Sequence, residues 1–97
     1  MINDSHGRPF REGAIGVAIG VAGLHPIEDK RGQEDLFGYR MQVTTVGLAD
    51  EIASAASLVM GQTNEALPVV IVRGVPYEPG EGAAREIIRE RSKDVFR

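Results

Sequence analysis

Apolar and small residues alternate strictly over residues 14–22, where the sequence reads AIGVAIGVA. One parity holds only branched aliphatic residues, Ile15, Val17, Ile19 and Val21. Because side chains of a strand point alternately to opposite faces, this period of two predicts a strand with one aliphatic face suited to a core. The other face carries only glycine and alanine, so another backbone, a helix or a ligand can approach it closely.

A helical period follows between Leu48 and Met60. Apolar residues recur there at intervals of three and four, while Asp50, Ser54 and Ser57 form a narrow polar stripe. The pattern predicts a largely buried helix. Gly61 is expected to end it, because glycine is favoured just past a helix C-terminus.

The other predicted elements are shorter. The alternation in residues 40–46 predicts a second strand, and the run of β-branched residues 69–72 predicts a buried one. Residues 83–91 have the spacing of a short amphipathic helix, and the stretches between these elements, including the residues before the first strand, are expected to be loops. The order of elements predicts an α+β fold with a small mixed sheet and two or three helices.

Length and composition bound the class of protein. The chain has 97 residues, so a single domain is predicted over residues 1–97, small enough for self-association to add to its stability. Hydrophobic residues make up 42% and charged residues 26%, as in an ordinary globular protein. The net charge of −3 gives no general reason to bind nucleic acid or an anionic membrane, although a local basic patch around Arg8 and Arg11 stays open.

Several chemistries are excluded or disfavoured. Cysteine is absent, so there is no disulfide, thiol nucleophile or thiolate metal site, and any metal must be held by oxygen or imidazole. No apolar stretch approaches the roughly 18–20 residues that span a bilayer, and no basic-then-apolar signal pattern is present, so the cytoplasm is the expected compartment. The sequence motifs of phosphate-binding loops, zinc proteases and serine hydrolases are also missing.

Two loops remain as candidate sites. Asp4 offers a carboxylate and Ser5 a neutral oxygen, both suited to Mg²⁺ or Mn²⁺, and Arg8 could neutralise a phosphate carried by such a cation. The same stretch also fits an ordinary turn or chain end. The second loop, residues 60–67, presents free amides and side-chain carbonyls after a predicted helix, as nucleotide-binding loops and simple connectors both do. Arg11 and Glu12 would flank the first stretch, unless they only form surface ion pairs.

Long segments of the chain match a known family. DSHGRPFREGAIGVAIGVAGLHPIEDKRGQEDLFGY, ADEIASAASLVMGQ and PVVIVRG occur in that order. Together they resemble the C-terminal part of the coenzyme F420:L-glutamate ligase family, also called F420-0:gamma-glutamyl ligases. The resemblance covers nearly the whole chain and implies the C-terminal portion of the gamma-glutamyl ligase fold.

The resemblance implies a GTP-dependent and metal-dependent enzyme that forms amide bonds. Members of the family add L-glutamate to a free carboxylate of the F420 precursor, and then a second glutamate through a γ-linkage. The implied reaction activates that carboxylate as an acyl phosphate, which the glutamate amine attacks. Mg²⁺ or Mn²⁺ would draw charge off the phosphates. The resemblance also implies an intertwined homodimer, so a homodimer is expected.

The same resemblance implies site residues. Asp4 matches a metal-ligating aspartate and Ser5 the neighbouring hydroxyl ligand, while Gln62 matches a residue that reaches a second cation. Arg8 and Arg11 match motif positions for which contacts to phosphate or substrate are expected, and they are the catalytic candidates. The segment expected to contact the guanine nucleotide comprises Met60, Gly61, Gln62, Thr63, Asn64, Glu65, Ala66 and Leu67.

The chain departs from the family in two ways. Members are much longer, and the preceding part holds a nucleotide-binding stretch and a further metal-ligating aspartate. The chain is therefore expected to be a truncated piece or a short relative, without the complete active site on its own. His6, where the family frequently has phenylalanine, could alter packing at the site. The alternative function is a non-catalytic module that dimerises through the bare strand face or binds a nucleotide.

Overall fold

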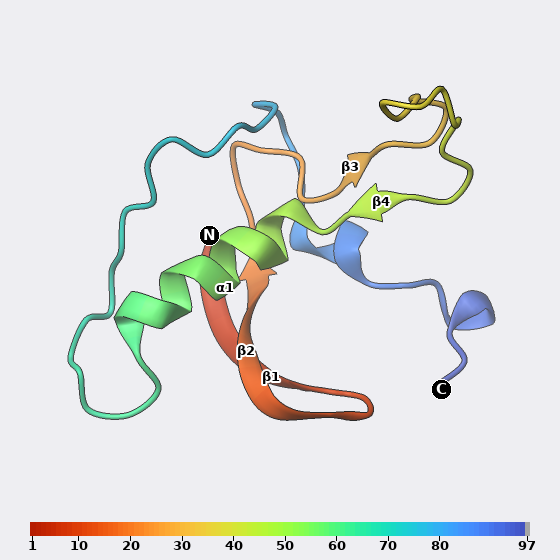
Figure 1. Ribbon diagram of the computed structural model, residues 1–97. Helices are drawn as coiled ribbons and strands as arrows, with labels where there is room; N and C mark the ends of the chain where they lie inside the picture. The colour runs from red at the N-terminus through yellow and green to blue at the C-terminus, as the bar shows by residue number, and fades with distance from the viewer. Residues whose placement is uncertain (97) are drawn as a thin grey trace.

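The computed structural model describes residues 1–96 and combines one α-helix with short antiparallel sheets (Figure 1). The predicted α+β class is confirmed. Within the described residues the strands form two separate two-stranded sheets, β1 with β2 and β3 with β4. The elements are β1 (Ile2–Arg8), β2 (Arg11–Gly20), β3 (Glu28–Asp29), β4 (Thr45–Val46), α1 (Leu48–Met60) and the 3-10 helices η1 (Ala84–Ile87) and η2 (Arg91–Lys93).

The N-terminal residues form a strand, so the loop predicted there is wrong. Residues of β1 pair antiparallel with β2, with Ser5 opposite Gly16 and Arg8 opposite Arg11. The turn between them contains Phe10 in the left-handed region, at φ 60°. The residues of β1 are mostly polar and show no alternation, so only the pairing with the neighbouring strand makes them extended. This pairing places Asp4 and Ser5 on a defined backbone.

Helix α1 packs on the small-residue face of β2, as the bare face of the predicted strand allowed. Gly16 is buried, Ala18 is 8% exposed, and Ala49 and Ala53 of the helix are fully buried. The opposite, aliphatic face is more open, because Ile15, Val17 and Val21 are only half-buried and Ile19 is 57% exposed. Within residues 1–96 the core therefore lies on the small face, and the expectation of a core on the aliphatic face is wrong.

The polar stripe of α1 satisfies backbone groups of β2. The Ala18 amide donates to Asp50 Oδ1 at 2.9 Å, and Ser54 Oγ donates to the Gly16 carbonyl at 2.7 Å. These side chains replace the hydrogen bonds that a further strand would make with β2. Two residues of the narrow polar stripe therefore fix the helix against the strand.

The remaining predicted elements are shorter than expected. The strand predicted at 40–46 is reduced to β4, and the helix predicted at 83–91 to η1, which starts after an extended Ala83. Residues 69–72 form no strand, and Val69 is 81% exposed. Their β-branched side chains favour extended backbone, but no described strand pairs with them. The prediction of a largely buried α1 is also wrong, since Leu58 and Val59 are exposed.

The second sheet pairs β3 with β4 within the long segment that connects β2 to α1 (Figure 1). Asp29 accepts hydrogen bonds from the Arg31 side chain, with Nη2 to Oδ2 at 2.6 Å. This contact, with the Arg31 backbone amide, lowers the pKa of Asp29 to about 2. Among the described residues no helix has the length and apolar character needed to cross a membrane.

Candidate functional site

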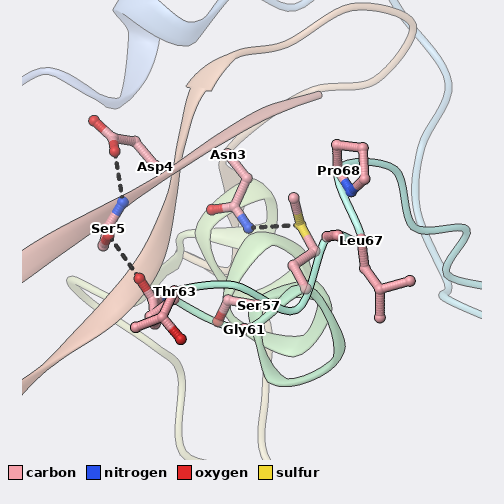
Figure 2. A pocket seen from close by; sticks show the side chains of 11 residues that line it. Asn3, Asp4, Ser5, Ser57, Gly61, Thr63, Leu67 and Pro68 are labelled. Carbon is pink, nitrogen blue, oxygen red and sulfur yellow. Dashed lines mark hydrogen bonds between the residues drawn. The ribbon is translucent and has the colours of Figure 1, made fainter.

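A cavity of about 500 Å³ lies where β1, the end of α1 and the following loop meet (Figure 2). It brings together the two stretches that the sequence singled out separately. The lining residues are Asn3, Asp4, Ser5, Ser57, Met60, Gly61, Gln62, Thr63, Ala66, Leu67 and Pro68.

The two stretches contact each other directly. Ser5 Oγ donates to Gln62 Oε1 at 2.8 Å, across 57 residues of sequence. Both atoms are neutral oxygens, and both belong to residues predicted as metal ligands. The fold therefore brings two candidate ligands, from a strand and from a helix-terminal loop, within hydrogen-bond distance.

Asp4 lines the same cavity from the neighbouring strand position. Its Oδ1 accepts a hydrogen bond from the Ser5 amide at 2.8 Å, while the Ser5 hydroxyl points toward the loop (Figure 2). The carboxylate is exposed, as are Ser5 and Gln62. The three residues line one cavity and carry one anionic and two neutral oxygen donors, with the Asp4 carboxylate directed away from the Ser5 hydroxyl and the loop (Figure 2).

This donor set fits a hard divalent cation in its chemistry. Mg²⁺ is typically bound by one or two carboxylates, with water and substrate phosphates completing its octahedron. Residues 1–96 contain no cluster of three or more His, Cys, Asp or Glu that could hold a metal. A cation at Asp4, Ser5 and Gln62 would therefore depend on ligands from phosphate or water.

The loop after α1 is organised around Glu65. Helix α1 ends at Gly61, whose φ of 72° and N–H bond to the Ser57 carbonyl, at 3.0 Å, match the predicted helix end. Glu65 folds back over this glycine and accepts a hydrogen bond from the Thr63 amide at 2.9 Å. That bond is the largest cause of a pKa of Glu65 below its ordinary value of 4.5. Ala66 adopts a left-handed φ of 56° and lines the cavity.

Acidification is expected to release this loop contact. Because the pKa of Glu65 is lower in the folded protein, the bonds to its carboxylate add stability above pH 4.5 and are lost as the pH falls through the lowered pKa. In an NMR titration the Thr63 amide signal should shift with a midpoint below 4.5. The Glu65→Gln variant should lack this transition, and a midpoint at or above 4.5 in the unaltered chain would contradict the assignment.

The two arginines lie outside the cavity. Arg8 is at the turn end of β1, where Nη2 donates to the carbonyls of Glu12, at 2.7 Å, and Gly13, at 3.2 Å. Arg11 is paired opposite Arg8 at the start of β2. Neither arginine lines the cavity that the metal candidates line, and their catalytic role stays a prediction. Asn64 and Glu65 also do not line the cavity, although they belong to the same loop.

Three lining residues, Asn3, Ser57 and Pro68, were missed by the sequence reasoning. Asn3 and Ser57 both face the cavity. Asn3 lies two positions before Ser5, so the alternation of a strand would have placed both on one face if the strand had been recognised. Ser57 belongs to the polar stripe of α1, and only the packing of the helix end against β1 gives it a place at the site.

The fold and the site together define an α+β protein with oxygen-bearing side chains around one cavity. Residues 1–74 match the family model described as F420-0:Gamma-glutamyl ligase. The chain belongs to the F420-0:gamma-glutamyl ligase family, and the resemblance stated from its motifs is confirmed.

Curated relatives of the chain share one name, coenzyme F420:L-glutamate ligase. The chain is 54% identical over 99 residues to the coenzyme F420:L-glutamate ligase of Methanothermobacter thermautotrophicus and 53% identical over 97 residues to that of Methanococcus maripaludis. It is 43% identical to the same enzyme of Archaeoglobus fulgidus. Each match covers 100% of this chain and 39% of the relative, so the chain spans about two fifths of the length of these curated relatives.

Proposed function

We propose that this chain supplies cation- and nucleotide-binding residues of a GTP-dependent ligase that joins L-glutamate to coenzyme F420-0. The observation that carries the proposal is the hydrogen bond from Ser5 to Gln62, which joins the strand and loop candidates at one cavity. Family membership supplies the reaction class, since the curated relatives are named coenzyme F420:L-glutamate ligases.

The reaction of such a ligase has two steps. The γ-phosphoryl group of GTP passes to the free carboxylate of F420-0, which leaves GDP and an acyl phosphate. The glutamate amine then attacks the acyl carbon, the amide bond forms, the amine loses a proton and phosphate leaves. A second cycle on the γ-carboxylate of the added glutamate would give the γ-linkage.

The residues of this chain serve the phosphate side of that reaction. Asp4, Ser5 and Gln62 would hold Mg²⁺ or Mn²⁺, which supplies neutralisation of phosphate charge when bound. The loop of residues 60–67 lies beside them and would contact the nucleotide through its backbone amides and side chains. Within that loop, the Glu65 carboxylate accepts a hydrogen bond from the Thr63 amide.

Calorimetric titration of the chain with GTP and Mn²⁺ tests the proposal. We expect saturable binding of GTP in the presence of Mn²⁺ and weaker binding without it, because the phosphates complete the coordination of the cation. The His6→Ala variant is the control, since His6 neighbours Ser5 but does not line the cavity. Absence of saturable heat from either ligand would contradict the proposal.

A second candidate, a non-catalytic dimerising or nucleotide-binding module, draws on the exposed apolar side chains. Leu58, Val69 and Ile71 are 87%, 81% and 73% exposed, respectively. The bare face of β2 is covered by α1, so a homodimer would use these other side chains. A stable dimer in sedimentation together with no binding of GTP or Mn²⁺ would favour this candidate over the ligase.

A further inference from the structure

Asn3 and Ser5 lie on one face of β1 and both contact the end of α1 and its loop. Asn3 Nδ2 donates to the Ala53 carbonyl at 2.9 Å. It also contacts Met60 Sδ at 3.6 Å (Figure 2). Ser5 contacts Gln62, two residues beyond Met60. Strand β1 therefore contacts α1 through Asn3 and the following loop through Ser5, and Asn3 is the more enclosed of the two.

The side-chain amide of Asn3 leaves one buried polar atom unsatisfied, which costs folding free energy. Its Oδ1 is buried and has no hydrogen-bond partner within residues 1–96. A Cβ placed on Gly16 would lie 2.9 Å from this oxygen, so the oxygen lies close against the strand backbone. An unsatisfied buried carbonyl destabilises a protein, whereas leucine has nearly the same shape and would carry no such penalty. Stability alone therefore does not account for the asparagine.

The place where Asn3 acts is the joint between helix and loop. Met60 is the last residue of α1, and Gly61 follows with a left-handed φ of 72°. Glycine permits many backbone conformations, so the direction in which the chain leaves the helix depends on how firmly the last helical turn is held. Asn3 contacts that turn through Met60 Sδ, immediately before the joint, while its bond to the Ala53 carbonyl ties the middle of the helix to β1.

We propose that Asn3 is a positioning residue of the cation site, which fixes the end of α1 against β1 so that Gln62 is presented to Ser5. The inference rests on the proposed function, in which Ser5 and Gln62 bind a divalent cation. Asn3 itself donates only to the helix end and need not touch the cation. Residues that orient metal ligands in this way commonly contribute a factor of about 10–100 to metal affinity.

Two variants of Asn3 test the proposal with Mn²⁺ alone as the probe. Asn3→Leu keeps the approximate shape of the side chain and removes both its N–H donor and its unsatisfied oxygen. Asn3→Ala removes the same groups with a smaller side chain that cannot clash with its neighbours. Electron paramagnetic resonance measures free Mn²⁺, and thermal unfolding followed by circular dichroism measures stability. We expect at least about tenfold weaker Mn²⁺ binding in both variants, with no loss of thermal stability in Asn3→Leu.

Ser54→Ala is the matched control. It removes a different hydrogen bond between α1 and β2, the one from Ser54 Oγ to the Gly16 carbonyl, and neither Ser54 nor Gly16 lines the cavity. We expect it to lower thermal stability and leave Mn²⁺ affinity unchanged. Mn²⁺ binding by the Asn3 variants equal to that of the unaltered chain, or weakened only as much as in Ser54→Ala, would overturn the positioning role. No Mn²⁺ binding by the unaltered chain would instead contradict the proposed function itself, and the inference with it.

Discussion

Replacing Gly16 by alanine is expected to lower the free energy of unfolding by about 3 kcal/mol. An added Cβ would lie 2.6 Å from the Ala53 carbonyl oxygen, 2.9 Å from Asn3 Oδ1 and 2.9 Å from Ser57 Cβ. The nearest of these atoms belongs to the backbone of α1, so relief requires the whole helix to move. Urea unfolding followed by circular dichroism measures the change.

Gly7→Ala is the matched control in the same hairpin. No atom lies within 4 Å of a Cβ built on Gly7. Because this residue sits in β1 rather than under the helix, we expect little or no loss of stability. If Gly16→Ala were as stable as Gly7→Ala, the close packing of α1 on β2, and with it the geometry of the site, would be contradicted.

Replacing Asp4 by alanine is expected to weaken Mn²⁺ binding by at least about a hundredfold and, in a full-length protein that contains this segment, to abolish turnover in an assay of glutamate ligation. Asp4 is the one carboxylate among the three predicted ligands, so its loss leaves only the neutral oxygens of Ser5 and Gln62. Calorimetry with Mn²⁺ measures the binding. Reduced affinity without a change in melting temperature would place the effect at the site.

Glu12→Gln removes one negative charge from the neighbouring strand and serves as the control for Asp4. Glu12 is exposed and does not line the cavity. We expect its Mn²⁺ affinity to stay close to that of the unaltered chain, since the interaction of separated exposed charges is largely screened. Unchanged Mn²⁺ binding and turnover in Asp4→Ala would remove Asp4 from the site.

Helix α1 shows which part of the fold could be predicted from local sequence. Its bounds, Leu48–Met60, agree with the prediction because apolar periodicity and a terminal glycine act within the segment itself. Strand β1 could not be found in this way, since its polar residues become extended only through pairing with β2. Residues 69–72 show the converse, because strong local β propensity forms no strand where no described strand pairs with it.

The candidate site was predicted in pieces and assembled only by the fold. The residues of β1 and of the loop were each plausible from their donor chemistry, but their separation of 57 residues hid the contact between Ser5 and Gln62. The family resemblance placed both in one site. Asn3 was missed because its role depends on the direction of its side chain toward Ala53 and Met60, which no local pattern shows. Arg8 was expected at the site on its charge, yet it caps carbonyls at the hairpin turn.

Paramagnetic broadening by Mn²⁺ in an NMR spectrum of the chain tests most directly whether strand β1 and the loop after α1 form one cation site. The account predicts that substoichiometric Mn²⁺ broadens the amide signals of Asp4, Ser5 and Gln62 together, because unpaired electrons relax nearby nuclei. Signals of Leu36 and Phe37, which do not line the cavity, should stay sharp at the same concentration. Broadening of Asp4 and Ser5 without Gln62, or of neither segment, would contradict a shared site.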